Sequence, residues 1–251
     1  MCIRDSKKMD NKIENNQEQI NTPKDSNNKN IISVIIVAVV IVVFAILLRG
    51  TTPNQKINNN TSNNEDLNVS IREISGEDHI LGNPNAKIKI VEYSDTGCPF
   101  CKMFHSTMHQ VVEDFNGEVA WVYRHFPILS LHPEAFNEAL ATECAWEQGG
   151  NDMFWNFTDQ IYTRTQSNNS FTSEDLNQIA LDLNLNMTQF SECLANEKYA
   201  DKVEQDILDG QLGGVRGTPS SFIVVDGEVV DQIEGAAPYQ SVKAQIEYYL
   251  R

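Results

Sequence analysis

GCPFCKMFH, residues 97–105, is the stretch that decides the fold. It places two cysteines, Cys98 and Cys101, two residues apart. Directly before it, residues 87–93 (KIKIVEY) form a compact run rich in β-branched residues, which predicts a strand. Residues 98–115 follow with apolar positions at helical spacing. A cysteine pair at such a strand-to-helix junction can bind a metal, close a structural disulfide or exchange electrons with other thiols.

The pattern of elements around this stretch predicts the fold class. The order is strand, helix, strand, helical block, strand, strand, helix, which is typical of an α/β thioredoxin-like fold with a helical insertion. The further predicted elements are a strand at 119–124, a helical block at about 131–209, a hairpin of 221–225 and 228–233 around Asp226-Gly227, and a helix at 239–250.

The charge of the chain excludes one class of partner. The 251 residues carry 19 Lys and Arg against 35 Asp and Glu, a formal net charge of −16. Residues 1–30 hold six of the basic and five of the acidic residues, so residues 31–251 carry 13 − 30 = −17. Phosphate binding needs a basic face, and we therefore expect no nucleic-acid partner.

Residues 31–48, IISVIIVAVVIVVFAILL, form an uncharged apolar run. At about 1.5 Å per residue, a helix of this length spans roughly 27 Å, close to the hydrocarbon thickness of a bilayer. The apolar region of a cleaved signal peptide is usually about 7–15 residues long and ends in small residues. This run ends in FAILLRG instead. We therefore expect one uncleaved transmembrane helix, rather than a signal peptide or a buried core helix.

The flanking charges predict the orientation of this anchor. Five lysines precede it, whereas Arg49 and Lys56 are the basic residues that follow it before Arg72. This bias predicts a cytoplasmic N-terminus and an extracytoplasmic domain, where disulfides persist. The expected organisation is a cytoplasmic polar tail at 1–30 (with 1–8 interpreted as extraneous), the transmembrane anchor at 31–48, a flexible Asn-rich linker at 49–69, and the folded domain at 70–251.

The position of Cys98 favours a thiolate. Only the thiolate attacks a disulfide, and a free thiol has a pKa of about 8.5. Unpaired N–H groups and the helix dipole stabilise negative charge at a helix start, by at most about 2 kcal/mol or roughly 1.5 pKa units. Pro99 lacks an N–H and suits an early helical position. We expect Cys98 to be the exposed nucleophile and Cys101, one turn deeper, to resolve the mixed disulfide.

A metal site is the alternative for the same residues. The spacing C-x₂-C-x₃-H brings Cys98, Cys101 and His105 within reach of one ion. A closed zinc site usually takes four N or S ligands, and the sequence has no second CxxC. His109 lies about 12 Å along the helix axis from Cys101. We therefore expect no metal, and no cofactor beyond the cysteine pair.

Motifs along the whole domain resemble those of a known family. IVEYSDTGCPFCKMFHSTM, VYRHFPILSLHPEA, ATECAWEQGG and GVRGTPSSFIV occur in order. Together they resemble the DsbA-like branch of the thioredoxin superfamily, of the membrane-anchored bacterial type. The resemblance covers about residues 70–250. It implies a thiol-disulfide oxidoreductase whose helical insertion lies over the active site.

The resemblance also implies roles for residues far from the cysteines. Pro219 is expected to be cis and to lie beside the active pair. Thr218 and Arg216 are expected to flank a groove in which backbone groups pair with an extended substrate peptide. Pro99 and Phe100, next to Cys98, are the expected side-chain contacts with an unfolded chain.

Glu92 shares one face of its predicted strand with Ile88 and Ile90. It is either an exposed residue of a surface strand or a buried carboxyl near Cys101 that helps to move a proton. The DsbA-like family has an acidic residue at this spacing from the CxxC. The resemblance therefore favours the buried catalytic carboxyl.

Cys144 and Cys193 lie on apolar faces of two predicted helices of the insertion. They are either two buried thiols or a structural disulfide. The expected compartment is oxidising, and the family often pairs these positions, so we expect the disulfide.

Taken together, these features predict a membrane-tethered, extracytoplasmic thiol-disulfide oxidoreductase that introduces disulfides into exported proteins. The expected partners are unfolded or newly exported cysteine-containing proteins and, by family analogy, a quinone-linked membrane protein that reoxidises the pair. A reductase or an isomerase of the same fold is the alternative within this class. An isomerase usually needs a dimer, and no dimerisation segment is evident in the sequence, so we expect a monomer.

Overall fold

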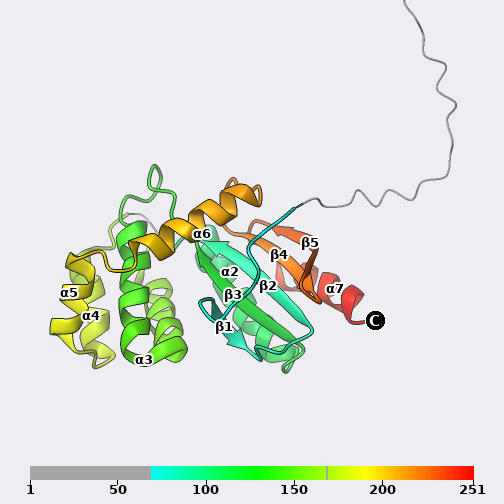
Figure 1. The fold of residues 1–251 in the computed structure, drawn as a ribbon, viewed down its shortest axis with the longest axis horizontal. Helices are drawn as coiled ribbons and strands as arrows, with labels where there is room; N and C mark the ends of the chain where they lie inside the picture. The colour runs from blue at the N-terminus through cyan, green and yellow to red at the C-terminus, as the bar shows by residue number, and fades with distance from the viewer. Residues whose placement is uncertain (1–68, 168) are drawn as a thin grey trace, which may run out of the picture. The chain divides into compact units, whose positions relative to one another are not determined.

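A computed structural model of the chain describes residues 69–167 and 169–251. At its centre lies a five-stranded mixed sheet with the strand order β1-β3-β2-β4-β5 (Figure 1). β2 and β3 are parallel, and the other neighbouring pairs are antiparallel. The strands are β1 (His79–Gly82), β2 (Ile88–Ser94), β3 (Val119–His125), β4 (Ser220–Val225) and β5 (Glu228–Glu234).

The helices form two groups. α2 and α7 pack on the sheet, whereas α3, α4 and α5 gather beside it and α6 crosses the sheet near β3 (Figure 1). The long helix α3 contains a break at Gly150, whose φ of 65° lies in the left-handed region that glycine tolerates. The helices are α2 (Pro99–Asp114), α3 (Ala135–Arg164), α4 (Ser173–Asp182), α5 (Met187–Ala195), α6 (Ala200–Leu212) and α7 (Tyr239–Leu250).

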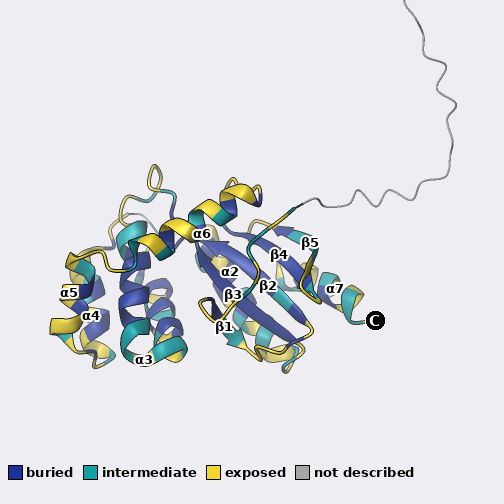
Figure 2. Cartoon of the chain, viewed as in Figure 1, coloured by how far each residue is buried: buried dark blue, intermediate teal, exposed yellow. Residues whose placement is uncertain are grey.

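The two faces of β2 separate two apolar layers, because successive side chains of a strand point to opposite faces. Ile88 and Ile90 belong to the core shared with α2 and α7. Val91 and Tyr93 belong to the core on the opposite face, against which Ile207 of α6 packs. The strands β2 and β3 are accordingly buried along almost their whole length (Figure 2). The CxxC helix α2 is thus fixed on a rigid central strand pair.

α6 is joined to the sheet by a buried ionic cluster around Arg124 of β3. The Arg124 side chain is fully buried and donates to Asp78 at 2.8 Å and to Asp209 of α6 at 2.7 Å. Arg72 adds ion pairs to Asp78 and Asp206, each at 3.0 Å. Removing one partner of a buried pair leaves an uncompensated charge, so this cluster couples the end of the insertion to the sheet.

Most of the predicted order of elements is present, and one element was missed. The hairpin around Asp226-Gly227 forms as expected, with positive φ at both turn residues. The edge strand β1 was not predicted, because four residues, HILG, show too little alternation. Across residues 69–167 and 169–251, no helix has the length and apolarity needed to cross a membrane. The predicted anchor at 31–48 and almost all of the linker at 49–69 lie outside the described residues.

Candidate active site

Cys98 is the N-cap residue of α2, at the junction with β2. Its backbone is extended (φ −81°, ψ 125°), and Pro99 occupies the first helical turn. The Cys98 N–H donates to the carbonyl oxygen of Asp95 at 3.0 Å, which closes the turn between strand and helix. The Cys98 side chain therefore lies at the positive end of the helix dipole.

The two cysteines are free thiols with opposite electrostatics. A hydrogen bond from the Cys101 thiol, followed by the backbone N–H groups of Cys101 and Phe100, lowers the pKa of Cys98 to about 6. Burial raises the pKa of the Cys101 thiol well above its ordinary value. The negative charge of a monoanionic pair therefore resides on Cys98.

The expectation that Cys98 is exposed was wrong, since only 5% of the residue is accessible. In the thiol form, its Sγ donates to the carbonyl oxygen of Thr218 at 3.5 Å. The loop that ends at β4 lies against the sulfur and covers it. Cys101 is completely buried, and its Sγ accepts from the Asp95 N–H at 3.4 Å.

The Thr218–Pro219 peptide bond is cis. Pro219 is buried at the start of β4, Thr218 is half-buried, and Arg216 is exposed two residues before Thr218. The structure therefore brings this loop and the CxxC together across 120 residues of sequence. The backbone at Thr218 is adjacent to the reactive sulfur.

Phe100 and Pro99 lie on the outer side of the pair. Both are exposed, and Phe100 is 57% accessible. A large exposed apolar ring beside a reactive cysteine can contact an apolar segment of an unfolded chain. Arg216, which is also exposed, offers a positive charge on the loop that carries Thr218.

Glu92 is fully buried on the face of β2 that carries Ile88 and Ile90. Neither carboxyl oxygen has a hydrogen-bond partner among the described residues. Burial raises the pKa of Glu92 to about 8, so the group is mainly protonated at neutral pH. The charge of Glu92 also raises the pKa of Cys101, which places the carboxyl electrostatically next to the resolving thiol.

Sequence reasoning missed a set of buried hydroxyl groups near Glu92. The hydroxyl oxygen of Tyr162 on α3 lies 3.0 Å from Ser94 Oγ and 3.2 Å from the hydroxyl oxygen of Tyr123. Burial raises the pKa of both tyrosines, so both remain neutral donors. Tyr162 comes from the insertion, and no local pattern connects it with β2.

Asp95 and His132 were also missed. Asp95 Oδ2 lies 2.9 Å from His132 Nδ1 and accepts from the Ile128 N–H at 2.7 Å. A Cβ at Gly97 would lie 2.7 Å from the Cβ of His132, so only glycine fits before Cys98. The contacts of Asp95 with His132 and with the Ile128 N–H thus hold the loop after β3 against the CxxC turn.

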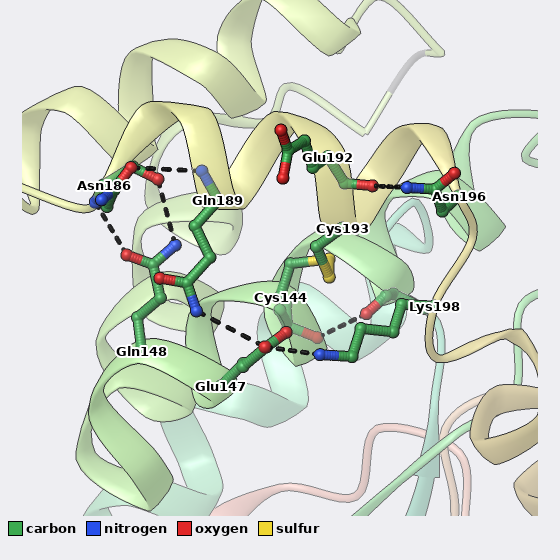
Figure 3. Close-up of a disulfide and its surroundings, with 11 residues drawn as sticks. Cys144, Glu147, Gln148, Asn186, Gln189, Glu192, Cys193, Asn196 and Lys198 are labelled. Carbon is green, nitrogen blue, oxygen red and sulfur yellow. Dashed lines mark hydrogen bonds and ion pairs between the residues drawn. A yellow bond between two sulfur atoms is a disulfide. The ribbon is translucent and has the colours of Figure 1, made fainter.

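Cys144 of α3 and Cys193 of α5 are joined by a disulfide with a Cα–Cα distance of 5.8 Å (Figure 3). Polar contacts surround it, and Lys198 pairs with Glu147 at 2.5 Å. Both cysteines belong to the apolar core of the insertion. The disulfide therefore links two helices of the insertion and leaves Cys98 and Cys101 as the free pair of the described residues.

Cys98, Cys101 and His105 do not converge as one ligand set. His105 Nε2 instead lies 2.7 Å from Asp159 Oδ1. Within the described ranges, the groups with metal-ligand geometry are His79, His125 and Glu143, and His105, His109 and Asp159.

Comparison with known proteins places this arrangement in a family. Residues 74–247 match the family model described as thioredoxin. The chain belongs to the thioredoxin family. Its fold is that of the DsbA proteins among solved structures.

Two solved structures illustrate the similarity. DsbA2 of Pseudomonas aeruginosa is 25% identical, with a TM-score of 0.61 over 70% of this chain and 97% of that protein. Oxidised BdbD of Bacillus subtilis is 24% identical, with a TM-score of 0.59 over 72% of this chain and 97% of that protein. Both likenesses extend over nearly the whole of the other protein.

Curated proteins that match by sequence are much longer than the matched region. A protein of Salinispora tropica named Na(+)/H(+) antiporter NhaA 3 is 33% identical over 146 residues, which is 58% of this chain and 21% of that protein. One of Mycolicibacterium gilvum, named NhaA 1, is 31% identical over 61% of this chain and 24% of its own length. This thioredoxin-family chain thus spans about a fifth to a quarter of the curated relatives that it matches.

Proposed function

We propose that the chain is an extracytoplasmic disulfide oxidase that introduces disulfides into newly exported, cysteine-containing proteins. The observation that carries this proposal is the difference in pKa between Cys98 and Cys101. Cys98 has a pKa lowered to about 6, while burial keeps Cys101 protonated. A stabilised Cys98 thiolate stabilises the reduced pair, which makes the oxidised pair a stronger oxidant.

The oxidised form carries a Cys98–Cys101 disulfide. A substrate thiolate attacks Cys98 Sγ, the S–S bond breaks, and its electron pair goes to Cys101, which takes up a proton. A second substrate thiolate then attacks the substrate sulfur of the mixed disulfide, and Cys98 leaves as the thiolate. The substrate loses two electrons and gains a disulfide, while the enzyme is reduced by two electrons.

Glu92 supplies the proton for Cys101 in this scheme. Its pKa of about 8 leaves it protonated at neutral pH, and it is buried beside the leaving thiolate. In the reverse direction, when the pair is reoxidised, the Glu92 carboxylate accepts the proton that Cys101 must lose. A buried thiol needs such a partner because solvent does not reach it.

The loop before β4 orients the substrate. The carbonyl oxygen of Thr218 lies against Cys98, and an extended peptide that pairs with this backbone would bring its cysteine to the same sulfur. Pro219 fixes the loop, Arg216 offers a positive rim, and Pro99 and Phe100 contact apolar substrate residues. Unfolded substrates offer an extended backbone and apolar residues to this surface, whatever their sequence.

Reoxidation of the pair requires an electron acceptor, and we assign this role to a quinone-linked membrane protein. The apolar segment 31–48 would hold the chain in the same membrane, with residues 49–69 as the tether and the N-terminal tail in the cytoplasm. The domain is proposed to act as a monomer.

The direct test is oxidative folding of a reduced, denatured disulfide protein. The oxidised chain should form substrate disulfides stoichiometrically, and catalytically when an oxidant regenerates it. Cys98→Ser and Cys101→Ser should each abolish the reaction, because neither variant can form the Cys98–Cys101 disulfide. Mixed with a disulfide-bonded substrate instead, Cys101→Ser should accumulate a mixed disulfide through Cys98, because no second cysteine is present to resolve it. The double variant C144S/C193S is the matched control, since it loses a cysteine pair outside the site, and it should retain the activity. Activity in Cys98→Ser would refute the proposal.

A further inference from the structure

Three side chains converge at a point separate from the reactive pair. His105 and His109 lie one turn apart on α2, and Asp159 faces them from α3. Asp159 Oδ1 lies 2.7 Å from His105 Nε2 and 2.9 Å from His109 Nε2. The two Nε2 atoms are 3.2 Å apart. Three potential ligand atoms thus form a closed triangle.

Hydrogen bonds alone cannot satisfy all three sides of this triangle. If both Nε2 atoms carry protons, both donate to Asp159, and two N–H groups face each other at 3.2 Å. If one Nε2 is unprotonated, it accepts from the other histidine and has no proton to donate to Asp159. A cation in place of the protons satisfies all three atoms at once.

The sides of the triangle are close in size to the edges of a coordination polyhedron. Zinc binds imidazole nitrogen and carboxylate oxygen at about 2.0–2.2 Å, so the ligand atoms of a tetrahedral or octahedral site lie about 3.0–3.4 Å apart. The Nε2–Nε2 side of 3.2 Å lies within this range, and the two sides to Asp159 Oδ1, 2.7 and 2.9 Å, are somewhat shorter and would lengthen around a bound ion. Two histidines four residues apart on one helix are a recurrent way to present two such ligands.

The surroundings leave one side of the triangle open. His105 is held in a buried position between the rings of Tyr162 and Trp121, at centroid distances of 4.3 and 5.1 Å. His109 and Asp159 are half-exposed and line a surface cavity of about 520 Å³. Three fixed ligands with an open fourth position are typical of accessible zinc sites.

The second cluster with ligand geometry is different. His79 and His125 each lie within hydrogen-bond distance of Glu143 Oε1, at 2.8 and 3.0 Å. Lys202 Nζ lies 3.6 Å from the same oxygen and already supplies a positive charge. The charge of the Glu143 carboxylate in that cluster is therefore balanced by Lys202 of the same chain, so its charge balance needs no metal ion.

We propose that His105, His109 and Asp159 bind a divalent transition-metal ion of the zinc type, with the fourth position open to the cavity. The ion would join α2, which carries Cys98 and Cys101, to α3 of the insertion. It uses neither cysteine. The site is therefore independent of the proposed oxidase activity, and each can fail without the other.

The test is a titration of the oxidised, metal-free full chain with Co²⁺, followed by displacement with Zn²⁺. One Co²⁺ per chain should give visible absorption without a sulfur-to-cobalt charge-transfer band. Zn²⁺ should raise the melting temperature of the same protein. His109→Gln and Asp159→Asn should weaken binding by at least about 100-fold. This is more than the usual effect of losing a residue that only hydrogen-bonds to a metal ligand.

Asp152→Asn is the matched control, because Asp152 is an exposed carboxylate on the same helix α3. It should bind Co²⁺ as the unchanged chain does. Melting curves without metal check that each variant folds. Equal Co²⁺ affinity in Asp159→Asn, a charge-transfer band that shows thiolate ligation, or no binding by the unchanged chain would each overturn the proposal.

Discussion

Cys98 Sγ is the atom whose charge decides the chemistry. The thiol of Cys101 and two backbone N–H groups lower its pKa to about 6. The rate of alkylation of the reduced protein by iodoacetamide should therefore rise with a midpoint near pH 6. Cys101→Ala removes the largest contribution and should move the midpoint upward. A midpoint near about 8.5 in the unchanged chain, the ordinary value for a thiol, would contradict this assignment.

Because the Glu92 carboxyl is buried, we expect its contribution to the free energy of unfolding to fall as the pH rises. Its pKa in the folded protein is about 8 against an ordinary value of 4.5, so its contribution is complete below about pH 4.5 and is lost as the pH rises through 8. A difference of one pKa unit between the folded and unfolded states corresponds to about 1.4 kcal/mol. Relative to Glu92→Gln, the free energy of unfolding of the unchanged protein should therefore fall by a few kcal/mol over this interval.

Chemical denaturation of both reduced proteins at several pH values measures this difference. Glu113→Gln, an exposed position on α2, is the control and should show no such trend relative to the unchanged chain. Glu92→Gln should also slow closure of the Cys98–Cys101 disulfide, because Cys101 loses its proton acceptor. A constant stability difference between about pH 4.5 and 8 would show that Glu92 is not a buried neutral acid.

The sequence alone identified the site residues that belong to a recognisable local sequence pattern. Cys98, Cys101 and Pro99 follow from spacing and from the helix start. Strand alternation singled out Glu92 but left its burial open, and the family resemblance favoured the buried carboxyl. Tyr162, His132 and Asp95 were missed because each meets its partner only after α3 and the loop after β3 have folded back. Cys98 was expected to be exposed because it begins the helix, whereas the loop that carries Thr218 covers its sulfur.

At the scale of elements, the disulfide between α3 and α5 is a stabilising link within the insertion. It closes a loop with a sequence separation of 49, which in the chain-entropy model stabilises by about 4 kcal/mol. The double variant C144S/C193S should therefore lose about 2–4 kcal/mol in denaturant unfolding. The alkylation midpoint of Cys98 should not change, and an altered midpoint would show that the link also shapes the site.

The order of the elements could be predicted because β2, α2, β3 and the hairpin have strong local periodicity. β1 could not, since a four-residue edge strand acquires its structure by pairing with β3. The docking of α6 could not be predicted either. It depends on the buried pairing of Arg124 with Asp78 and Asp209, three residues that share no local motif.

At the scale of the whole molecule, we propose that the apolar segment 31–48 anchors the chain and places the chemistry outside the cytoplasm. The full chain should remain with membranes after alkaline extraction, and a chain without residues 1–48 should not. Protease added to intact cells stripped of their wall should digest the domain and spare the N-terminal tail. Release of the full chain by alkali, or a domain protected from protease, would contradict the proposed topology.

The proposal that the chain is an oxidase depends on the reduction potential of the Cys98–Cys101 disulfide in the folded domain. A stabilised Cys98 thiolate favours the reduced pair, and the proposed direction requires a strongly oxidising disulfide. The measurement that tests this most directly is the reduction potential of Cys98–Cys101 from equilibrium titration with glutathione. A potential clearly above that of thioredoxin, about −270 mV, and towards that of the strong oxidant DsbA, about −120 mV, is the predicted result; a potential near −270 mV or below it would contradict the account.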